Sequence, residues 1–260
     1  MKIPYFHVDA FASAPFRGNP AGVCPLDRWL PDATLQAIAA ENNLAETAFV
    51  VPRGKEFDLR WFTPTIEIDL CGHATLASAF VLFNYRSYAG DEIRFHSQSG
   101  ILSVSRNQDI LTLDFPSRPP KECNSPELLL LGLGKSPLEV HKSRDYLVVF
   151  AREEEVRALK PDFAMLRKVD CLGVIATAPG KDCDFVSRFF APNAGVDEDP
   201  ATGSSHCTLI PYWAQRLGNQ KLFARQVSQR GGEFYCEIAG DRVRIGGRAV
   251  LYLSGEIEVI

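Results

Sequence analysis

The sequence lacks the segments that mark membrane, secreted and nucleic-acid-binding proteins. No apolar stretch approaches the roughly 18 residues that a membrane-spanning helix needs, and Met1 to Asp9 contain a proline and polar residues where a signal peptide has its apolar core. The 28 basic and 32 acidic residues give a net charge of −4 and form no Lys/Arg-rich run, which argues against a nucleic-acid surface. We therefore expect a soluble, cytoplasmic protein with neither a membrane nor a nucleic-acid partner.

Cysteines are present, but they lack the spacing of a disulfide framework or a zinc finger. There are seven, an odd number, and no two of them have CxxC spacing, which argues for reduced thiols. Cys71 with His73, and His206 with Cys207, offer metal ligands, yet neither pair has the usual zinc spacing. We therefore expect no metal. The GxGxxG, Walker A and GxSxG patterns are absent too, so nucleotide-fold and α/β-hydrolase functions lack their main support.

What the sequence does contain is a motif that occurs twice. Each copy runs from an aromatic strand, through a proline and an acidic turn, to a glycine-containing step that opens an apolar helix. The first copy comprises Arg60–Pro64 and Asp69–Leu76, and the second comprises Arg188–Pro192 and Asp197–Leu209. The 260 residues leave room for two modest domains. The duplication suggests two similar halves, with two helix N-termini lining a cleft between them.

Short strand-like runs separated by turn residues dominate, and hairpins around Gly240 and Gly247 favour antiparallel sheet. The segment His73–Phe83 is apolar on nearly all faces, which predicts a fully buried helix. Its counterpart Ser205–Leu217 contains Pro211, which should kink the helix or confine its regular part. The other helices are expected at Asp32–Asn42 and Glu153–Leu159.

The proline-rich segment Pro116–Pro137 is the best candidate for a linker between the halves. Within it, Leu128–Leu131 is apolar enough for a short docked helix. We therefore predict an N-terminal half of residues 1–118 and a C-terminal half of residues 119–260.

The start of the second repeated helix would suit an anion. Asp199 is followed by small residues that include Gly203 and Ser204, so a carboxylate or phosphate could approach the backbone amides, aided by the helix dipole. A plain helix cap explains the same residues, because Thr, Ser and Asp are the usual N-cap residues. In the first copy, Gly72 also opens a helix and is followed by His73, where dipole and burial would lower an imidazole pKa.

Two further candidates lie outside the repeat. Glu46 stands just before an apolar strand, where a half-buried carboxyl would suit general acid/base catalysis. The residues alone favour an ordinary loop glutamate in water. Asn19 lies in a Gly-Asn-Pro sequence, which is first of all turn chemistry, with a ligand contact as the alternative.

At these motifs the sequence resembles the PhzF-like family, which is named for an isomerase of phenazine biosynthesis. The matching stretches occur in order across the chain: Val8–Phe11, Pro15–Val23, Asn43–Phe49, Arg60–Pro64, Leu70–Ala77, Arg188–Pro192 and Glu198–Ser204. The resemblance implies an α+β, diaminopimelate-epimerase-like fold. Two pseudo-symmetric halves would each wrap a curled, mostly antiparallel sheet around a central helix, with the active site in the cleft between them. It also implies that the last strand, about residues 250–260, can cross back to the first half, and that the protein is a homodimer.

The resemblance further implies proton transfer without a cofactor, acting on a small anionic, carboxylate-bearing metabolite. Glu46 would be the proton shuttle, and His73 and Asp199 would hold or polarise the substrate's polar groups. The backbone at Gly72, and at Gly203 with Ser204, would bind the substrate's anionic group. Asn19 would contribute a further substrate contact.

One departure from the related epimerases bears on mechanism. Those enzymes use two opposed cysteines, and Cys71 stands at the first place, while Asp199 and Pro200 occupy the region of the second. A two-thiol racemase is therefore disfavoured. Ala45 also lacks the hydroxyl that precedes the catalytic glutamate in the phenazine enzyme. Two alternatives stay open: an epimerase that depends on Cys71, and a non-catalytic ligand-binding or interaction protein on the same scaffold.

Overall fold

The computed structural model describes residues 1–259 and divides into two compact units. The first comprises residues 1–114 together with the chain from residue 246 onward, and the second comprises residues 115–245. Both units combine a mixed, mostly antiparallel sheet with few helices, so the predicted α+β class is confirmed. Within the described residues, no helix is both long and apolar enough to cross a membrane.

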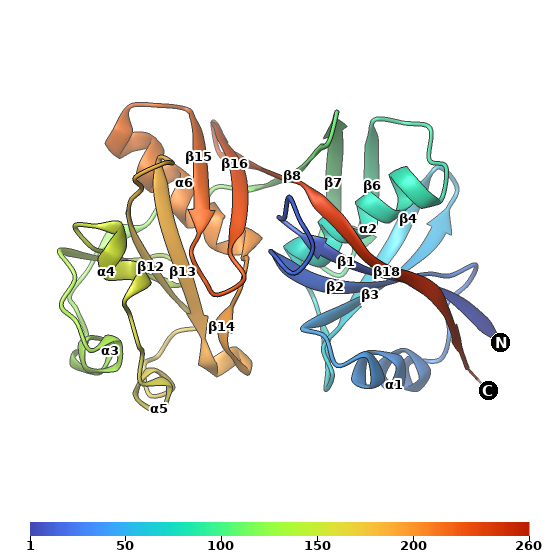
Figure 1. Cartoon of the computed structure of the whole chain (residues 1–260), viewed down its shortest axis with the longest axis horizontal. Helices are drawn as coiled ribbons and strands as arrows, with labels where there is room; N and C mark the ends of the chain where they lie inside the picture. The colour runs from blue at the N-terminus through green and yellow to red at the C-terminus, as the bar shows by residue number, and fades with distance from the viewer. Residues whose placement is uncertain (260) are drawn as a thin grey trace. The chain divides into compact units, whose positions relative to one another are not determined.

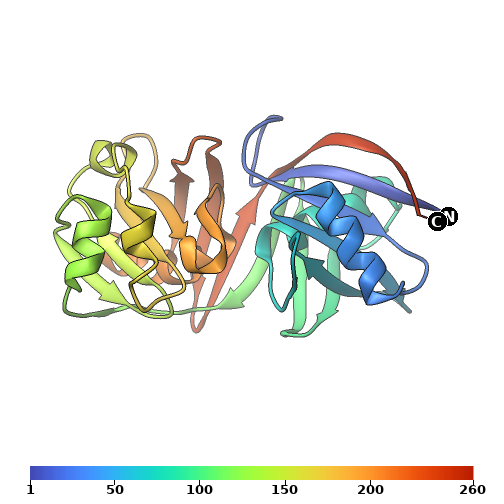
Figure 2. The ribbon, with the colours of Figure 1, turned by 90° about the horizontal axis from the view of Figure 1, so that it is seen from below.

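The first unit is built mainly from strands, with one helix between β2 and β3 and another between β5 and β6. Its strands are β1 (Lys2–Ala10), β2 (Asn19–Pro25), β3 (Glu46–Arg53), β4 (Glu56–Phe62), β5 (Glu67–Ile68), β6 (Glu92–Ser97), β7 (Gly100–Asn107), most of β8 (Ile110–Pro116) and β18 (Ala249–Glu258). Strand β1 pairs antiparallel with both β2 and β18, while β2 pairs parallel with β3. Because Lys2 pairs with Glu258, the first and last strands lie side by side, as Figures 1 and 2 show.

Helix α2 (Gly72–Tyr85) forms the centre of the first unit. Its sequence is apolar all round, and nearly every residue from Gly72 to Phe83 is buried, as a helix without a polar face requires. Small residues such as Ala74 and Ala77, both 0% exposed, let the surrounding strands approach closely, and Figure 1 shows the strands of this unit around it. The predicted buried helix is confirmed, and α1 (Asp32–Asn42) has the predicted bounds.

The second unit places short helices against a mixed sheet. Its strands are β9 (Lys121–Glu122), β10 (Glu139–Lys142), β11 (Tyr146–Val149), β12 (Val174–Pro179), β13 (Phe185–Ala191), β14 (Val196–Asp199), β15 (Lys221–Gln226), β16 (Gly232–Ala239) and most of β17 (Arg242–Gly247). Its helices are α3 (Glu127–Leu133), α4 (Glu153–Arg157), α5 (Phe163–Leu166), α6 (Gly203–Leu217) and the 3₁₀ turn Pro192–Ala194. Strands β11 and β12 are parallel, whereas β12–β13 and β15–β16 are antiparallel.

Helix α6 continues through Pro211, so the proline does not confine the regular part of the helix, and the alternative of a kink stays a prediction. A proline inside a helix costs about 3 kcal/mol because it removes a backbone hydrogen bond and crowds the preceding turn. Burial on the far side of the proline offsets this cost. Trp213 is 1% exposed, stacks on Phe185 with ring centroids 5.6 Å apart, and donates its indole N–H to Thr177 Oγ1 at 3.0 Å.

Candidate active site

Three elements of the first unit bring their N-terminal ends together. Asn19 is the first residue of β2 and Glu46 is the first residue of β3; these strands are parallel, and Ala21 lies opposite Glu46. Helix α2 begins directly after Cys71, so His73 lies in its first turn. A cluster of an amide, a carboxyl, a thiol and an imidazole results from segments far apart in the sequence.

The imidazole of His73 is the centre of this cluster. Its Nδ1 lies 3.1 Å from Asn19 Nδ2, and its Nε2 lies 3.0 Å from Glu46 Oε2. The Cys71 sulfur lies 3.5 Å from Nδ1 and 4.0 Å from Nε2. Only 6% of the His73 side chain and 15% of the Glu46 side chain are exposed. The ring is therefore fixed on both edges, in surroundings that contain little water.

The expected direction of the His73 pKa is wrong. Burial does oppose the charged ring, but the Cys71 sulfur and the Glu46 carboxylate outweigh it and raise the pKa of His73 well above its ordinary value. Burial raises the pKa of the Cys71 thiol to about 11, so this thiol keeps its proton near neutral pH.

The Glu46 carboxylate has an oxygen that is not engaged by a hydrogen bond. Oε2 is buried and forms the ion pair with His73, yet it has no hydrogen-bond partner among residues 1–259. Buried carboxylate oxygens normally accept several hydrogen bonds, and an unmade one is costly. Apart from the ion pair with His73, this oxygen can accept a proton or bind a cation that enters the site.

Asn19 differs from its expected setting. It is not in the turn but opens β2, and it is 0% exposed. The turn itself lies just before it, at Gly18, where φ is +64° and a Cβ atom would lie 2.1 Å from Ala10 O. Only glycine fits this position, and the tight turn directs the Asn19 side chain to His73.

In the second unit, the loop before α6 is held by buried polar side chains. Thr202 donates its hydroxyl hydrogen to the Asp199 carboxylate, and its backbone N–H donates to Gln226 Oε1 at 2.8 Å. The Gln226 amide also donates to Thr202 Oγ1 at 3.2 Å, and Gln226 is 1% exposed. These bonds fix the loop from Asp199 to Gly203 at the start of the helix.

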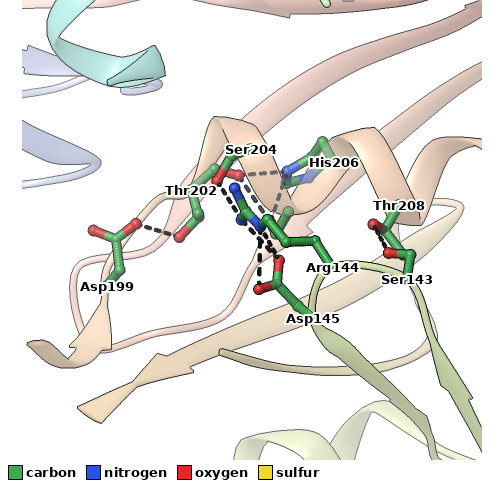
Figure 3. A network of polar contacts seen from close by, with 9 residues as sticks. Ser143, Arg144, Asp145, Asp199, Thr202, Ser204, His206 and Thr208 are labelled. Carbon is green, nitrogen blue, oxygen red and sulfur yellow. Dashed lines mark hydrogen bonds and ion pairs between the residues drawn. The ribbon is translucent and has the colours of Figure 1, made fainter. Parts of the chain in front are cut away.

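Arg144 reaches the N-terminal turn of α6 from the loop before β11 (Figure 3). Its guanidinium pairs with the Asp145 carboxylate at 2.7 Å, and Asp145 is 1% exposed. The same Nη2 donates to Ser204 Oγ at 3.3 Å. Because Ser204 Oγ accepts this bond, its own hydrogen can be donated to a ligand. No sequence pattern points to this contact, since Arg144 lies far from Ser204 along the chain and outside the repeated motif.

His206 lies in the first turn of α6 and is fully buried. Its Nδ1 lies 2.8 Å from Thr202 O, and a carbonyl only accepts, so Nδ1 carries the hydrogen. Its ring stacks on Phe234 with centroids 3.8 Å apart. Burial lowers the pKa of His206 to about 4, so the ring is neutral near pH 7 and positions the Thr202 carbonyl (Figure 3).

The structure thus brings the predicted residues together in two sets. Asn19, Glu46 and His73 meet in the first unit, where Gly72 opens α2. In the second unit, Asp199 lies in the loop that leads to Gly203 and Ser204 at the start of α6. The prediction missed Arg144 and Gln226.

Comparisons with known proteins agree on one family. The phenazine biosynthesis-like protein family matches residues 8–255. The chain is 54% identical to a Pseudomonas aeruginosa protein named an uncharacterized isomerase, over the whole length of both chains. A crystal structure of a PhzF-family phenazine biosynthesis protein from Enterococcus faecalis matches with a TM-score of 0.98 and 50% identity, also over the full length of both chains.

A more distant structure shows how far the fold extends. A hydroxyproline epimerase from Agrobacterium vitis matches with a TM-score of 0.63 at 11% identity, covering 98% of this chain and 92% of that one. This likeness concerns the fold alone, and it confirms the predicted epimerase-like architecture. The chain belongs to the phenazine biosynthesis-like protein family.

Proposed function

We propose that this family member is an isomerase that needs no cofactor and that moves a proton within a small, carboxylate-bearing metabolite. The observation that carries the proposal is the Glu46 carboxylate: a buried oxygen without a hydrogen bond, 3.0 Å from His73 Nε2. The relatives named isomerases support the reaction class. The expected homodimer and cytoplasmic location stay predictions.

In the proposed reaction, Glu46 acts first as a base and then as an acid. Its carboxylate removes a proton from a C–H group of the substrate, and the electron pair of that bond enters an enol- or carbanion-like intermediate. Glu46 then returns the proton to a different atom, so that the substrate is isomerised and the enzyme is unchanged. Positioned acid/base groups of this kind contribute about 10²–10⁴-fold to rate. The His73 imidazolium would stabilise negative charge that develops on the intermediate.

The second set of residues would serve substrate binding. The amides at Gly203 and the hydroxyl of Ser204 would bind the anionic group, because an N-terminal helix turn offers unpaired N–H donors and a favourable dipole. Asp199 would hold a polar group of the substrate.

The Cys71-dependent epimerase is the less favoured alternative. The sulfur is close enough to His73 to exchange a proton, at 3.5 Å. A thiol whose pKa is raised to about 11 by burial is a poor base near neutral pH. If Cys71→Ser and iodoacetamide-treated wild-type protein both keep their activity, this alternative is excluded.

The experiment is a hydrogen-exchange screen in D₂O. Purified protein is incubated with cyclic and amino-acid-like carboxylates, and deuterium incorporation is followed by NMR and mass spectrometry. We expect one compound class to exchange, and Glu46→Gln to lower the rate at least about 100-fold. Glu41→Gln is the matched control, because Glu41 is exposed on α1 nearby in the sequence.

The two variants separate chemistry from folding. Glu46→Gln should keep the circular dichroism spectrum and the ligand affinity of the wild type, since glutamine has the same shape and can still contact His73. Undiminished exchange in Glu46→Gln would refute the assignment of Glu46. Absence of exchange in the wild type across the whole panel would favour the non-catalytic binding protein.

A further inference from the structure

The cluster around His73 also has the composition of a metal site. Glu46, Cys71 and His73 offer a carboxylate, a thiol and an imidazole, and one ligand atom of each lies within 4.8 Å of the others. The spacing of Cys71 and His73 in the sequence provides only two ligands. The fold adds the third, because strand β3 brings Glu46 to the start of α2.

The distances are close to those of a tetrahedral zinc site. With Zn–S of about 2.3 Å and bonds to N and O of about 2.0 Å, tetrahedral angles place sulfur about 3.6 Å from nitrogen, and nitrogen about 3.3 Å from oxygen. The corresponding distances are 4.0 Å from Cys71 Sγ to His73 Nε2 and 3.0 Å from Nε2 to Glu46 Oε2. The three ligand atoms all lie within 4.8 Å of one another, and rotation of the Cys71 and Glu46 side chains would bring them to these distances.

The donor set selects the kind of cation. Thiolate and imidazole are ligands for zinc and similar thiophilic ions, whereas magnesium and calcium prefer oxygen ligands only. Three protein ligands leave a fourth position for water, as in zinc sites that are not purely structural. The Asn19 side chain lies against the other ring nitrogen, with Nδ2 at 3.1 Å from Nδ1. A half-turn of this amide would place its carbonyl oxygen against a hydrogen on Nδ1, which is how an outer residue orients a histidine that binds metal.

We propose that Glu46, Cys71 and His73 form a binding site for Zn²⁺ or a similar thiophilic divalent cation. Binding replaces the thiol hydrogen of Cys71 and the imidazolium hydrogen of His73, so two protons leave as one cation enters. The bound site is then neutral, because a carboxylate and a thiolate balance the charge of the ion. The cation occupies the Glu46 oxygen that has no hydrogen bond.

One consequence rests on the proposed function. A cation on Glu46 would take away the proton shuttle, so micromolar zinc would inhibit the isomerase reversibly, and a chelator would restore it. The binding itself does not depend on any activity, and it is measured separately. A protein that binds zinc at this site without exchanging any substrate would refute the isomerase and leave the metal site standing.

The test uses the full-length protein, freed of metal by a chelator and dialysed. It is titrated with Zn²⁺ in a calorimeter and with Co²⁺ in a spectrophotometer, because cobalt bound to thiolate gives a sulfur-to-metal charge-transfer band. We expect one ion per chain, the charge-transfer band, and competition of Zn²⁺ for Co²⁺. Cys71→Ser should abolish the band and weaken Zn²⁺ binding at least about tenfold.

The matched control is Cys207→Ser, which replaces another buried cysteine, at 3% exposure. It should keep both the stoichiometry and the band. The surface pairs of His96 with Glu56 and His141 with Glu139 could bind zinc weakly, and such binding would be equal in Cys71→Ser and the wild type. Equal binding in these two proteins, or a wild type without the charge-transfer band, would overturn the proposal. The charge-transfer band is measured on the wild type, so the proposal can be refuted even if Cys71→Ser does not fold.

Discussion

Buried His206 should make the protein sensitive to mild acid. Burial lowers the pKa of this imidazole to about 4, against an ordinary value of 6.5. Between these two values the unfolded chain binds a proton at His206 that the folded chain does not, so the free energy of unfolding rises with pH in this window. The contribution of His206 to the free energy of unfolding is fully present above pH 6.5 and is lost as the pH falls towards 4.

The magnitude follows from the two pKa values. At 1.36 kcal/mol for each pH unit, the window from 6.5 to about 4 corresponds to roughly 3 kcal/mol, to be taken as an order of magnitude. A typical domain is stable by about 5–15 kcal/mol, so this is a large fraction. The cause is local: Nδ1 donates to Thr202, while Nε2 is buried against Phe234 and has no hydrogen-bond partner among residues 1–259.

The assay is urea unfolding followed by circular dichroism at several pH values between 7 and 4, on the wild type and on His206→Asn. Asparagine can keep a donor near the Nδ1 position but does not titrate. Other groups titrate equally in both proteins, so the difference between the two pH profiles isolates His206. We expect the wild type to lose roughly 3 kcal/mol more than the variant over this range. Parallel profiles would refute the reasoning.

Two further predictions concern residues that position the two candidate sets. Gly18→Ala should destabilise the protein by more than about 2 kcal/mol, through backbone strain and a clash with Ala10 O. Gly54 is the control: it has a similar φ, but nothing lies within 4 Å of an added Cβ atom, so Gly54→Ala should cost only about 1 kcal/mol. Equal shifts of the thermal unfolding midpoint in the two variants would contradict the clash. Arg144→Gln should raise KM about tenfold, with little change in kcat, for the substrate that the exchange screen identifies, because Ser204 loses the hydrogen bond that orients its hydroxyl. A loss confined to kcat would contradict this role of Arg144.

The central architecture could be predicted because its signal is local. A helix such as α2, which is apolar on every face, is stable only when it is buried, and its run of apolar residues predicts this burial directly. The passage of α6 through Pro211 could not be predicted, because the compensating burial of Trp213 against Phe185 comes from another element. Likewise, the entry of Asn19 into β2 depends on a pairing of β1 with β2 that places Ala10 opposite Asn19.

The candidate residues were identifiable, but their interactions were not. Glu46 and His73 lie on separate elements, and the sequence gives no distance between them. The sequence therefore predicts a lowered pKa for His73, whereas in the structure this pKa is raised. Arg144 is similar: its role depends on a contact with Ser204 that crosses sixty positions of the chain. Electrostatic partners are properties of the tertiary structure, whereas burial can be anticipated from the pattern of apolar residues.

The two repeated helices show what this difference means for function. His73 and His206 each lie in the first turn of a buried helix, where burial and the helix dipole both disfavour a charged ring. The pKa of His206 falls, as this common setting dictates, because its partners are a carbonyl and an aromatic ring. The pKa of His73 rises, because the Cys71 sulfur and the Glu46 carboxylate, whose Oε2 lies 3.0 Å from Nε2, together outweigh burial. A thiol at the start of the helix and a carboxylate from outside the repeat therefore shift the pKa values of two similar histidines in opposite directions, and this asymmetry is the strongest physical reason to look for the chemistry at Glu46 and His73.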